Sequence, residues 1–318
     1  MLNETYELPT IWGRNMKTRK LLGKLGRSKG RGLRAAGVLA VAASMLAACG
    51  SASTSSSTGA TGMLAQVESS HQLIIAMSAY APEDFQNSSG KWTGYDPVIL
   101  SAFAKTIGAK LVIDAIPFAA SVEAVATHRA DITIDIYYTK ARAQVIAFSR
   151  PMLNYDDVVA VSKTHPQVTK DTVKALSGKN IAVVTGSEEV NEANKTPNAH
   201  VIQYSNIEET FLALGSGRVA ADYQPDTDVS WAIHQDPSLD VKILGPMPTS
   251  LAPPIASLRG YYGVPKGSYG KEFLQRLNAY LKKIECNGTE QKMIDQFGMQ
   301  NPVYLAGLCT AANVYNGS

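Results

Sequence analysis

Apolar and polar residues alternate from Asp131 to Tyr137, and the stretch is rich in isoleucine and threonine, which predicts a strand. The next residues, Thr139-Lys-Ala-Arg142, predict a helix start with Thr139 as N-cap and Arg142 in the first turn. A strand end followed by a helix start gathers free backbone N–H groups and a guanidinium at one place, which suits a carboxylate. The same pattern also fits an ordinary turn with a surface arginine.

The rest of the chain alternates between strand-like and helix-like patterns, which favours an α/β fold. Short apolar or alternating runs predict strands at 73–77, 111–118, 181–184 and 217–226, and an extended crossing at 156–163. Helical spacing, together with start and stop signals, predicts helices at 207–214, 272–285 and 290–297. Two further helices are predicted to begin at Pro97, with Asp96 as N-cap, and at Glu188. Ser205 and Glu208 have the spacing of a capping box before the helix at 207–214.

The first 48 residues have the pattern of a signal peptide. A long basic segment precedes an apolar run, 35–48, that is too short to span a bilayer as a mature helix. The run ends in Leu46-Ala-Ala-Cys49, which resembles a lipobox, so we expect cleavage before Cys49 and lipid attachment to its sulfur. A plain signal peptide with a stray cysteine is the alternative. Residues 49–70 are rich in Ser, Thr, Gly and Ala and predict a flexible tether.

Charge and cysteine content narrow the function classes. Nine of the 30 Lys and Arg residues and two of the 27 Asp and Glu residues precede Cys49. The net charge of the remaining chain is therefore near −4, whereas that of the full chain is +3. No basic patch with interleaved aromatic residues is present, so we expect no nucleic-acid partner. The two remaining cysteines, Cys286 and Cys309, predict a disulfide in an exported chain. The five histidines lack metal-site spacing, so we expect no metal and no cofactor.

Three segments together resemble the polar-amino-acid family of extracellular solute-binding proteins, the capture subunits of ABC importers. They are Gly90-Lys-Trp-Thr-Gly-Tyr-Asp-Pro-Val-Ile99, the strand and helix start that end at Arg142, and Val145-Ile-Ala-Phe-Ser-Arg-Pro-Met152. The resemblance covers roughly residues 72–300 and is stronger in the first half.

The resemblance implies a two-lobed periplasmic-binding-protein fold of type II, each lobe a sheet flanked by helices, with two crossings at the hinge. The expected division is a first lobe at 71–160 and 258–318 and a second lobe at 161–257. It also implies a monomer, lipid-anchored on the extracytoplasmic face of the cell membrane, that captures a small polar solute by lobe closure and delivers it to an ABC permease.

The resemblance further implies a set of ligand-binding residues. Arg142 is the carboxylate anchor, Tyr80 and Phe118 are aromatic walls, and Ser187 and Glu188 lie in a second carboxylate-binding loop. Asp135 and Tyr137 depart from the small residue and the threonine usual at their positions. The family's ammonium-binding aspartate aligns with Pro225, one residue before Asp226. Acidic and aromatic residues facing the cleft would suit a ligand with a cationic group. Alternatively, the aromatic residues pack in the core, and Asp135 or Glu188 faces solvent or caps a helix.

An exported enzyme on the same fold, similar to cyclohexadienyl dehydratases, is the alternative function. A cleft carboxylate such as Asp135 or Glu188 would then be the general acid. No acid and base pair has convincing spacing, and the chain contains neither a nucleophile elbow nor a P-loop. We therefore expect a binding protein rather than an enzyme.

Overall fold

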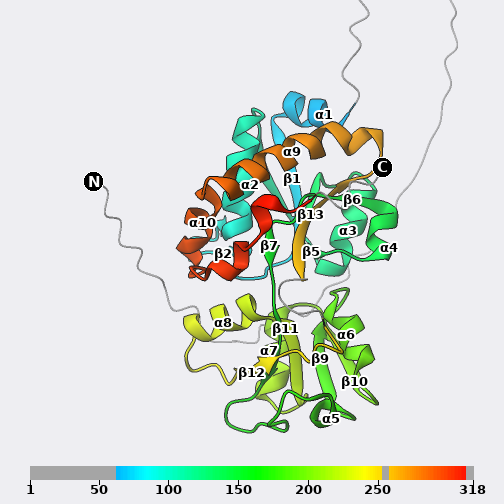
Figure 1. Ribbon diagram of the computed structural model, residues 1–318, viewed down its shortest axis with the longest axis vertical. Helices are drawn as coiled ribbons and strands as arrows, with labels where there is room; N and C mark the ends of the chain where they lie inside the picture. The colour runs from blue at the N-terminus through cyan, green and yellow to red at the C-terminus, as the bar shows by residue number, and fades with distance from the viewer. Residues whose placement is uncertain (1–61, 253–257, 313–318) are drawn as a thin grey trace, which may run out of the picture. The chain divides into compact units, whose positions relative to one another are not determined.

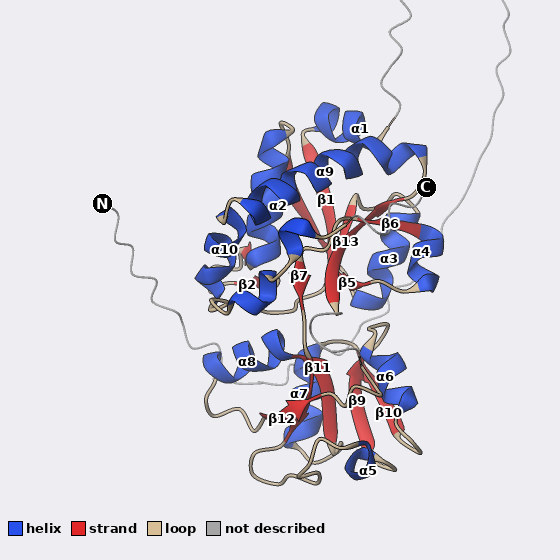
Figure 2. Ribbon diagram, in the orientation of Figure 1, coloured by secondary structure: helices blue, strands red, loops and turns tan. Residues whose placement is uncertain are grey.

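The computed structural model describes residues 62–252 and 258–312, in which two mixed sheets are each flanked by helices (Figure 1, Figure 2). The first sheet has the strand order β4-β1-β5-β13-β6, with β7 paired to β13. Its strands are β1 (Gln72–Met77), β4 (Lys110–Ala115), β5 (Ile132–Tyr137), β6 (Ile146–Phe148), β7 (Leu153–Asn154) and β13 (Arg259–Pro265). Strands β1, β4 and β5 are parallel, and β13 runs antiparallel to β5 and β6.

The second sheet has the order β10-β9-β11-β8-β12. Its strands are β8 (Asp157–Val161), β9 (Asn180–Val184), β10 (His200–Tyr204), β11 (Ala221–Pro225) and β12 (Lys242–Pro246). The chain leaves the first sheet after β7 and is back in it at β13, which gives the expected two lobes. The run expected as a crossing at 156–163 is largely strand β8 of the second sheet. The change of sheet therefore comes about four residues before the predicted boundary at 160/161.

Helices cover the sheets, and a small hairpin, β2 (Phe85–Gln86) with β3 (Trp92–Thr93), precedes α2. The helices are α1 (Met63–Ser70), α2 (Tyr95–Thr106), α3 (Phe118–Ala126), α4 (Lys140–Val145), α5 (Val173–Leu176), α6 (Glu189–Lys195), α7 (Ile207–Gly215), α8 (Asp226–Gln235), α9 (Ser268–Cys286) and α10 (Thr289–Ile294), and the 3-10 helices are η1 (Asp295–Phe297), η2 (Pro302–Leu305) and η3 (Leu308–Thr310). Within the described ranges, no helix combines the length and the apolar character needed to cross a membrane.

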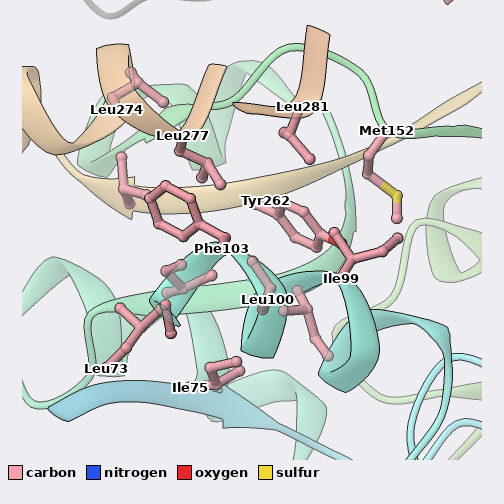
Figure 3. Packing of buried hydrophobic residues seen from close by; sticks show 14 of the residues in the cluster. Leu73, Ile75, Ile99, Leu100, Phe103, Met152, Tyr262, Leu274, Leu277 and Leu281 are labelled. Carbon is pink, nitrogen blue, oxygen red and sulfur yellow. The ribbon is translucent and has the colours of Figure 1, made fainter. Parts of the chain in front are cut away.

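The core of the first lobe lies between its sheet and helices α1, α2 and α9 (Figure 3). The helical spacing predicted at 272–285 is confirmed, because Phe273, Leu277, Leu281 and Ile284 of α9 are all buried there. Figure 3 shows Leu277 and Leu281 pointing from α9 toward the residues of α2. Strands of the second lobe are covered on both faces: alternate residues of β8 belong to two separate apolar clusters.

Four local predictions need correction. Residues 63–70 form α1 rather than the end of a tether, because Met63, Leu64 and Val67 pack into the first-lobe core. Helix α2 begins two residues earlier than predicted, with Gly94 as N-cap, and the buried Asp96 accepts a hydrogen bond from a tyrosine hydroxyl instead of capping.

The other two corrections concern a cap and a strand end. The N-cap of α7 is Asn206 rather than Ser205; its side chain accepts from the Glu209 amide, and Glu209 accepts from the Ser205 amide. The capping box is therefore shifted by one residue. The strand predicted at 111–118 ends at Ala115, so that Phe118 begins α3.

A buried ion pair holds the C-terminal segment on the first lobe. Cys286 of α9 is disulfide-bonded to Cys309. Beside this bond, Arg150 donates to Glu285 at 2.9 Å through Nε and to the Leu308 carbonyl at 2.6 Å. The Arg150 and Glu285 side chains are only 3% and 1% exposed. Removing one partner of such a pair leaves the other charge buried.

Arg150→Met should therefore destabilise the protein by about 3–5 kcal/mol in urea unfolding, because it leaves Glu285 without its cation. Arg129→Met is the matched control, since Arg129 pairs with Asp114 at the surface, where the side chains are 56% and 36% exposed. An exposed pair contributes at most about 1 kcal/mol. Equal losses in both variants would contradict a stabilising role for the buried pair.

Candidate ligand-binding site

A pocket lies where the end of the first sheet meets the second lobe. With its mouth it comprises about 400 Å³ of atom-free space. It is lined by Tyr80, Glu83, Phe118, Asp135, Tyr137, Arg142, Tyr155, Ser187, Glu188, Glu189, Pro225 and Asp228. Five of these side chains are acidic, and Arg142 is the one basic residue among these described lining residues. The lining of the pocket is thus aromatic and acidic.

A bulge in β5 aims Asp135 at the pocket. Ile136 pairs with Tyr261 and Thr133 with Gly263, so β5 has one residue more than β13 between the same two points. Asp135 has φ 56°, a left-handed conformation that is uncommon for residues other than glycine. The extra residue changes the facing of the strand: Ile134 packs with the α2 and α9 side, whereas Ile136 packs with the α3 side. The pattern of apolar residues alone does not reveal this.

The buried carboxyl groups of the pocket are held by hydroxyl groups. Glu83 is 1% exposed and accepts from Tyr95 and Thr227, both at 2.9 Å. Asp135 accepts a short hydrogen bond from Tyr155. Desolvation by burial raises the pKa of Glu83, and raises the pKa of Asp135 and Asp228 well above the usual range, with the charge of Glu83 adding to both. Such shifts favour a protonated carboxyl or a bound cation.

Arg142 lies at the opposite end, between the two lobes. Thr139 accepts from the Arg142 amide, which confirms the predicted N-cap of α4. The guanidinium donates to the Tyr137 carbonyl at 2.8 Å and, across the cleft, to the Gly186 carbonyl at 2.9 Å. It also lies 5.6 Å from the centre of the Phe118 ring. Desolvation lowers the pKa of Arg142, whereas the charges of Glu188 and Glu189 raise it.

The lobes touch closely beside this arginine. A side-chain carbon at Gly186 would come within 2.9 Å of the Ala119 backbone, and Gly186 has φ 84°. At the other end of the cleft, Thr227 of α8 donates to Glu83 of the first lobe. Tyr304 of η2 donates to Asp226 at 3.0 Å. These contacts describe a closed arrangement of the two lobes.

The structure brings most of the predicted residues together. Seven of the eight predicted ligand-binding positions line the pocket, namely Tyr80, Phe118, Asp135, Tyr137, Arg142, Ser187 and Glu188. The rings of Tyr80 and Phe118 lie 5.7 Å apart. Asp226 does not line the pocket, because its carboxyl is turned toward Tyr304 and the Asp156 amide. Asp228, two residues further along α8, lines it instead.

Sequence reasoning missed Glu83, Glu189 and Asp228. Glu83 follows the loop after β1, and its neighbour Tyr80 was found only through the family pattern. Asp228 lies inside the first turn of α8, a position that also suits a solvent-facing acid. The burial that distinguishes these acids arises from contacts between distant segments, so no local signal marks them.

Comparison with known proteins places the chain in a family. The model of the bacterial extracellular solute-binding proteins, family 3, matches residues 73–300. A histidine-binding periplasmic protein of Escherichia coli is 23% identical over 227 residues, which cover 69% of this chain and 84% of that protein. The solved substrate-binding protein of an amino acid ABC transporter is 27% identical with a TM-score of 0.63, covering 71% of this chain and 98% of the other.

A second solved structure, an ancestral arginine-binding protein bound to arginine, is 25% identical with a TM-score of 0.63, covering 71% of this chain and 98% of that one. The two-lobed fold and the family match over residues 73–300 lead to the same assignment. This chain belongs to the bacterial extracellular solute-binding proteins, family 3.

Proposed function

We propose that this protein is the substrate-binding subunit of an ABC importer and that it captures an amino acid, or a similar zwitterion, with an additional cationic group. The observation that carries the proposal is the charge of the pocket. Five acidic side chains line it with one arginine, and Glu83, Glu189 and Asp228 are buried there. A cationic ligand would offset charge that burial otherwise makes costly.

Arg142 is the proposed partner of the ligand carboxylate. A guanidinium binds a carboxylate with two parallel hydrogen bonds, and the start of α4 holds this one at the cleft. The Phe118 ring lies beside it and limits the approach of water. Ser187 and Glu188 precede α6 on the facing lobe, so that a ligand held by Arg142 would contact both lobes.

The cationic part of the ligand would lie toward the acidic end. Asp135, Glu83 and Asp228 line that end together with the rings of Tyr80 and Tyr155. Ring faces and carboxylates both attract ammonium and guanidinium groups. The named binding partners of two relatives, histidine and arginine, have this chemistry. Positively charged amino acids are therefore the ligand class that we propose.

Capture would proceed by closure of the lobes. The cross-lobe contacts of Arg142 with Gly186 and of Thr227 with Glu83 bracket the pocket. A solute held between them would be shielded from water, and the closed form would then be presented to a membrane permease.

Anchoring through Cys49 remains a proposal from the sequence, because Cys49 lies outside the described residues. One relative is named as a periplasmic protein and another as the substrate-binding protein of an ABC transporter, which supports an extracytoplasmic location. They are named as binding proteins rather than enzymes, which supports binding over a dehydratase-like activity.

Arg142→Ala should weaken the binding of L-arginine by roughly 30-fold or more in calorimetry. Loss of one partner of a buried charge pair costs about 2–5 kcal/mol, and 1.4 kcal/mol corresponds to a factor of ten. Arg129→Ala, a surface change in the same lobe, is the control and should bind as the unaltered protein does. Unchanged affinity in Arg142→Ala would contradict the role of Arg142 as carboxylate anchor.

Gly186→Ala should weaken L-arginine binding and leave the lobes open. The added methyl would meet Ala119 at 2.9 Å, and the left-handed backbone at Gly186 is strained for alanine. Small-angle scattering with saturating L-arginine should show compaction for the unaltered protein and a smaller change for the variant. Gly90→Ala, also at positive φ but with open space around it, is the control. Normal compaction of Gly186→Ala would contradict this model of closure.

Cys49→Ala should release the protein from the membrane into the soluble fraction, because the lipid on that sulfur is the proposed attachment. Cell fractionation followed by immunoblotting measures the distribution. Membrane retention of the variant equal to that of the unaltered protein would rule out lipidation at Cys49 as the anchor.

A further inference from the structure

Hydrogen-bond counting shows that the acidic end of the pocket contains an extra proton. Asp135, Tyr155, Tyr95 and Glu83 form a continuous chain: Tyr155 contacts Asp135, the two tyrosine oxygens lie 2.6 Å apart, and Tyr95 lies 2.9 Å from Glu83. These three hydrogen bonds need three hydrogen atoms. The two hydroxyl groups supply two, since each O–H donates once. The third hydrogen must be on one of the terminal carboxyls, Glu83 or Asp135, which then donates to its tyrosine while the other carboxyl accepts from its own.

The Glu83 and Asp228 pair gives a second, independent indication. Glu83 of the first lobe and Asp228 of α8 line the same pocket, and Thr227, the residue before Asp228, donates to Glu83 at 2.9 Å. A hydrogen bond between the two carboxyl groups adds to the burial that raises the pKa of Asp228. Two ionised carboxylates both accept and neither donates, so this contact also requires a proton. Glu83 Oε2 and Asp228 Oδ1 are buried and receive no hydrogen bond from any other described residue. Both residues line the pocket, and these two oxygens have the capacity to accept from a ligand.

We infer that Glu83 and Asp228 are the specificity-determining pair of the site: in the empty closed protein they share a proton, and a cationic ligand group displaces it. The ligand N–H groups then donate to both carboxylates, and the proton leaves to solvent. This inference rests on the proposed function of the pocket. Because the two carboxylates come from different lobes, one cation between them would also hold the lobes together.

Among the described residues, no basic group contributes to the pKa shifts of Glu83, Asp135 or Asp228. The groups that interact electrostatically with Glu83, Asp135 or Asp228 come from several elements, and all of them are acids or tyrosines. They are Asp84, Tyr95, Asp96, Tyr155, Glu189 and Tyr304. Arg142 acts instead on Glu189, whose pKa it lowers against the raising effect of burial. Among these described groups, all the charges near the pair are negative, which favours retention of the proton.

The sign of the pH dependence follows from the direction of the pKa shifts. Burial raises the pKa of Glu83 and of Asp228 above the unfolded values of about 4.3 and 3.9. The folded protein therefore binds more protons than the unfolded chain at pH values above about 4. The contribution of these two carboxyl groups to the stability of the empty protein is therefore fully present below their unfolded pKa values. It is lost as the pH rises through their pKa values in the folded protein.

The first test needs no ligand. Glu83→Gln replaces the shared proton with a permanent N–H donor, so it should raise the melting temperature of the empty protein at pH 8 by about 2–4 °C and flatten its change between pH 5 and 8. Glu188→Gln is the matched control, because Glu188 lines the same pocket but accepts from Asn191 at its surface. A Glu83→Gln profile parallel to that of the unaltered protein would overturn the inference, and Asp228→Asn provides the same readout if Glu83→Gln fails to fold.

The second test uses L-arginine as the probe. Calorimetric titrations at pH 7 in phosphate and in Tris, which differ in ionisation enthalpy, give the number of protons exchanged on binding. We expect release of about one proton per arginine, and release close to zero in Glu83→Gln. Binding without proton release would overturn the inference while leaving the proposed function intact. Absence of arginine binding would contradict the proposed function, and the melting profiles would still decide whether the pair shares a proton.

Discussion

The energetic constraint on this protein is the burial of several carboxyl groups around one small pocket. An ionised carboxylate loses its hydration when it is buried, and that loss is large unless a cation or hydrogen-bond donors replace the water. Here hydroxyl groups of Tyr95, Tyr155 and Thr227 replace part of it. They do not neutralise the charge, so we propose that the empty protein retains a proton there and that the filled protein holds a ligand cation. Selectivity then follows from the same cost, because a neutral or acidic ligand leaves the carboxylates uncompensated.

The fold creates this constraint by joining two separately built lobes. Each lobe has its own sheet and core, and the pocket forms only where the loop with Glu83, the bulge at Asp135 and the first turns of α6 and α8 come together. Arg142 links the lobes at one end through Gly186, and Glu83 links them at the other end through Thr227. In the binding mode that we propose, recognition of the two ends of a zwitterion and closure of the cleft are therefore the same physical event.

Local patterns predicted much of this. The Thr139 cap, the apolar face of α9 and the strand β9 depend on neighbours in sequence, and the structure has them close to where the pattern places them. The family pattern located Arg142 and the aromatic walls. The predictions were wrong where contacts between distant segments determine the local structure. Helix α1 forms because its apolar side packs on the first-lobe core, and β8 belongs to the second sheet because it pairs with β11 and β12. Glu83 and Asp228 gain their importance only from facing each other across the cleft.

A thermal-shift screen of the purified protein against single amino acids, each at the same concentration, tests the central claim most directly, since a ligand that binds only the folded state raises the melting temperature more the more tightly it binds. The account predicts the largest shifts for L-arginine, L-lysine or L-histidine, smaller ones for L-glutamine and none for L-glutamate. A larger shift with L-glutamate or L-glutamine than with every cationic amino acid would contradict it.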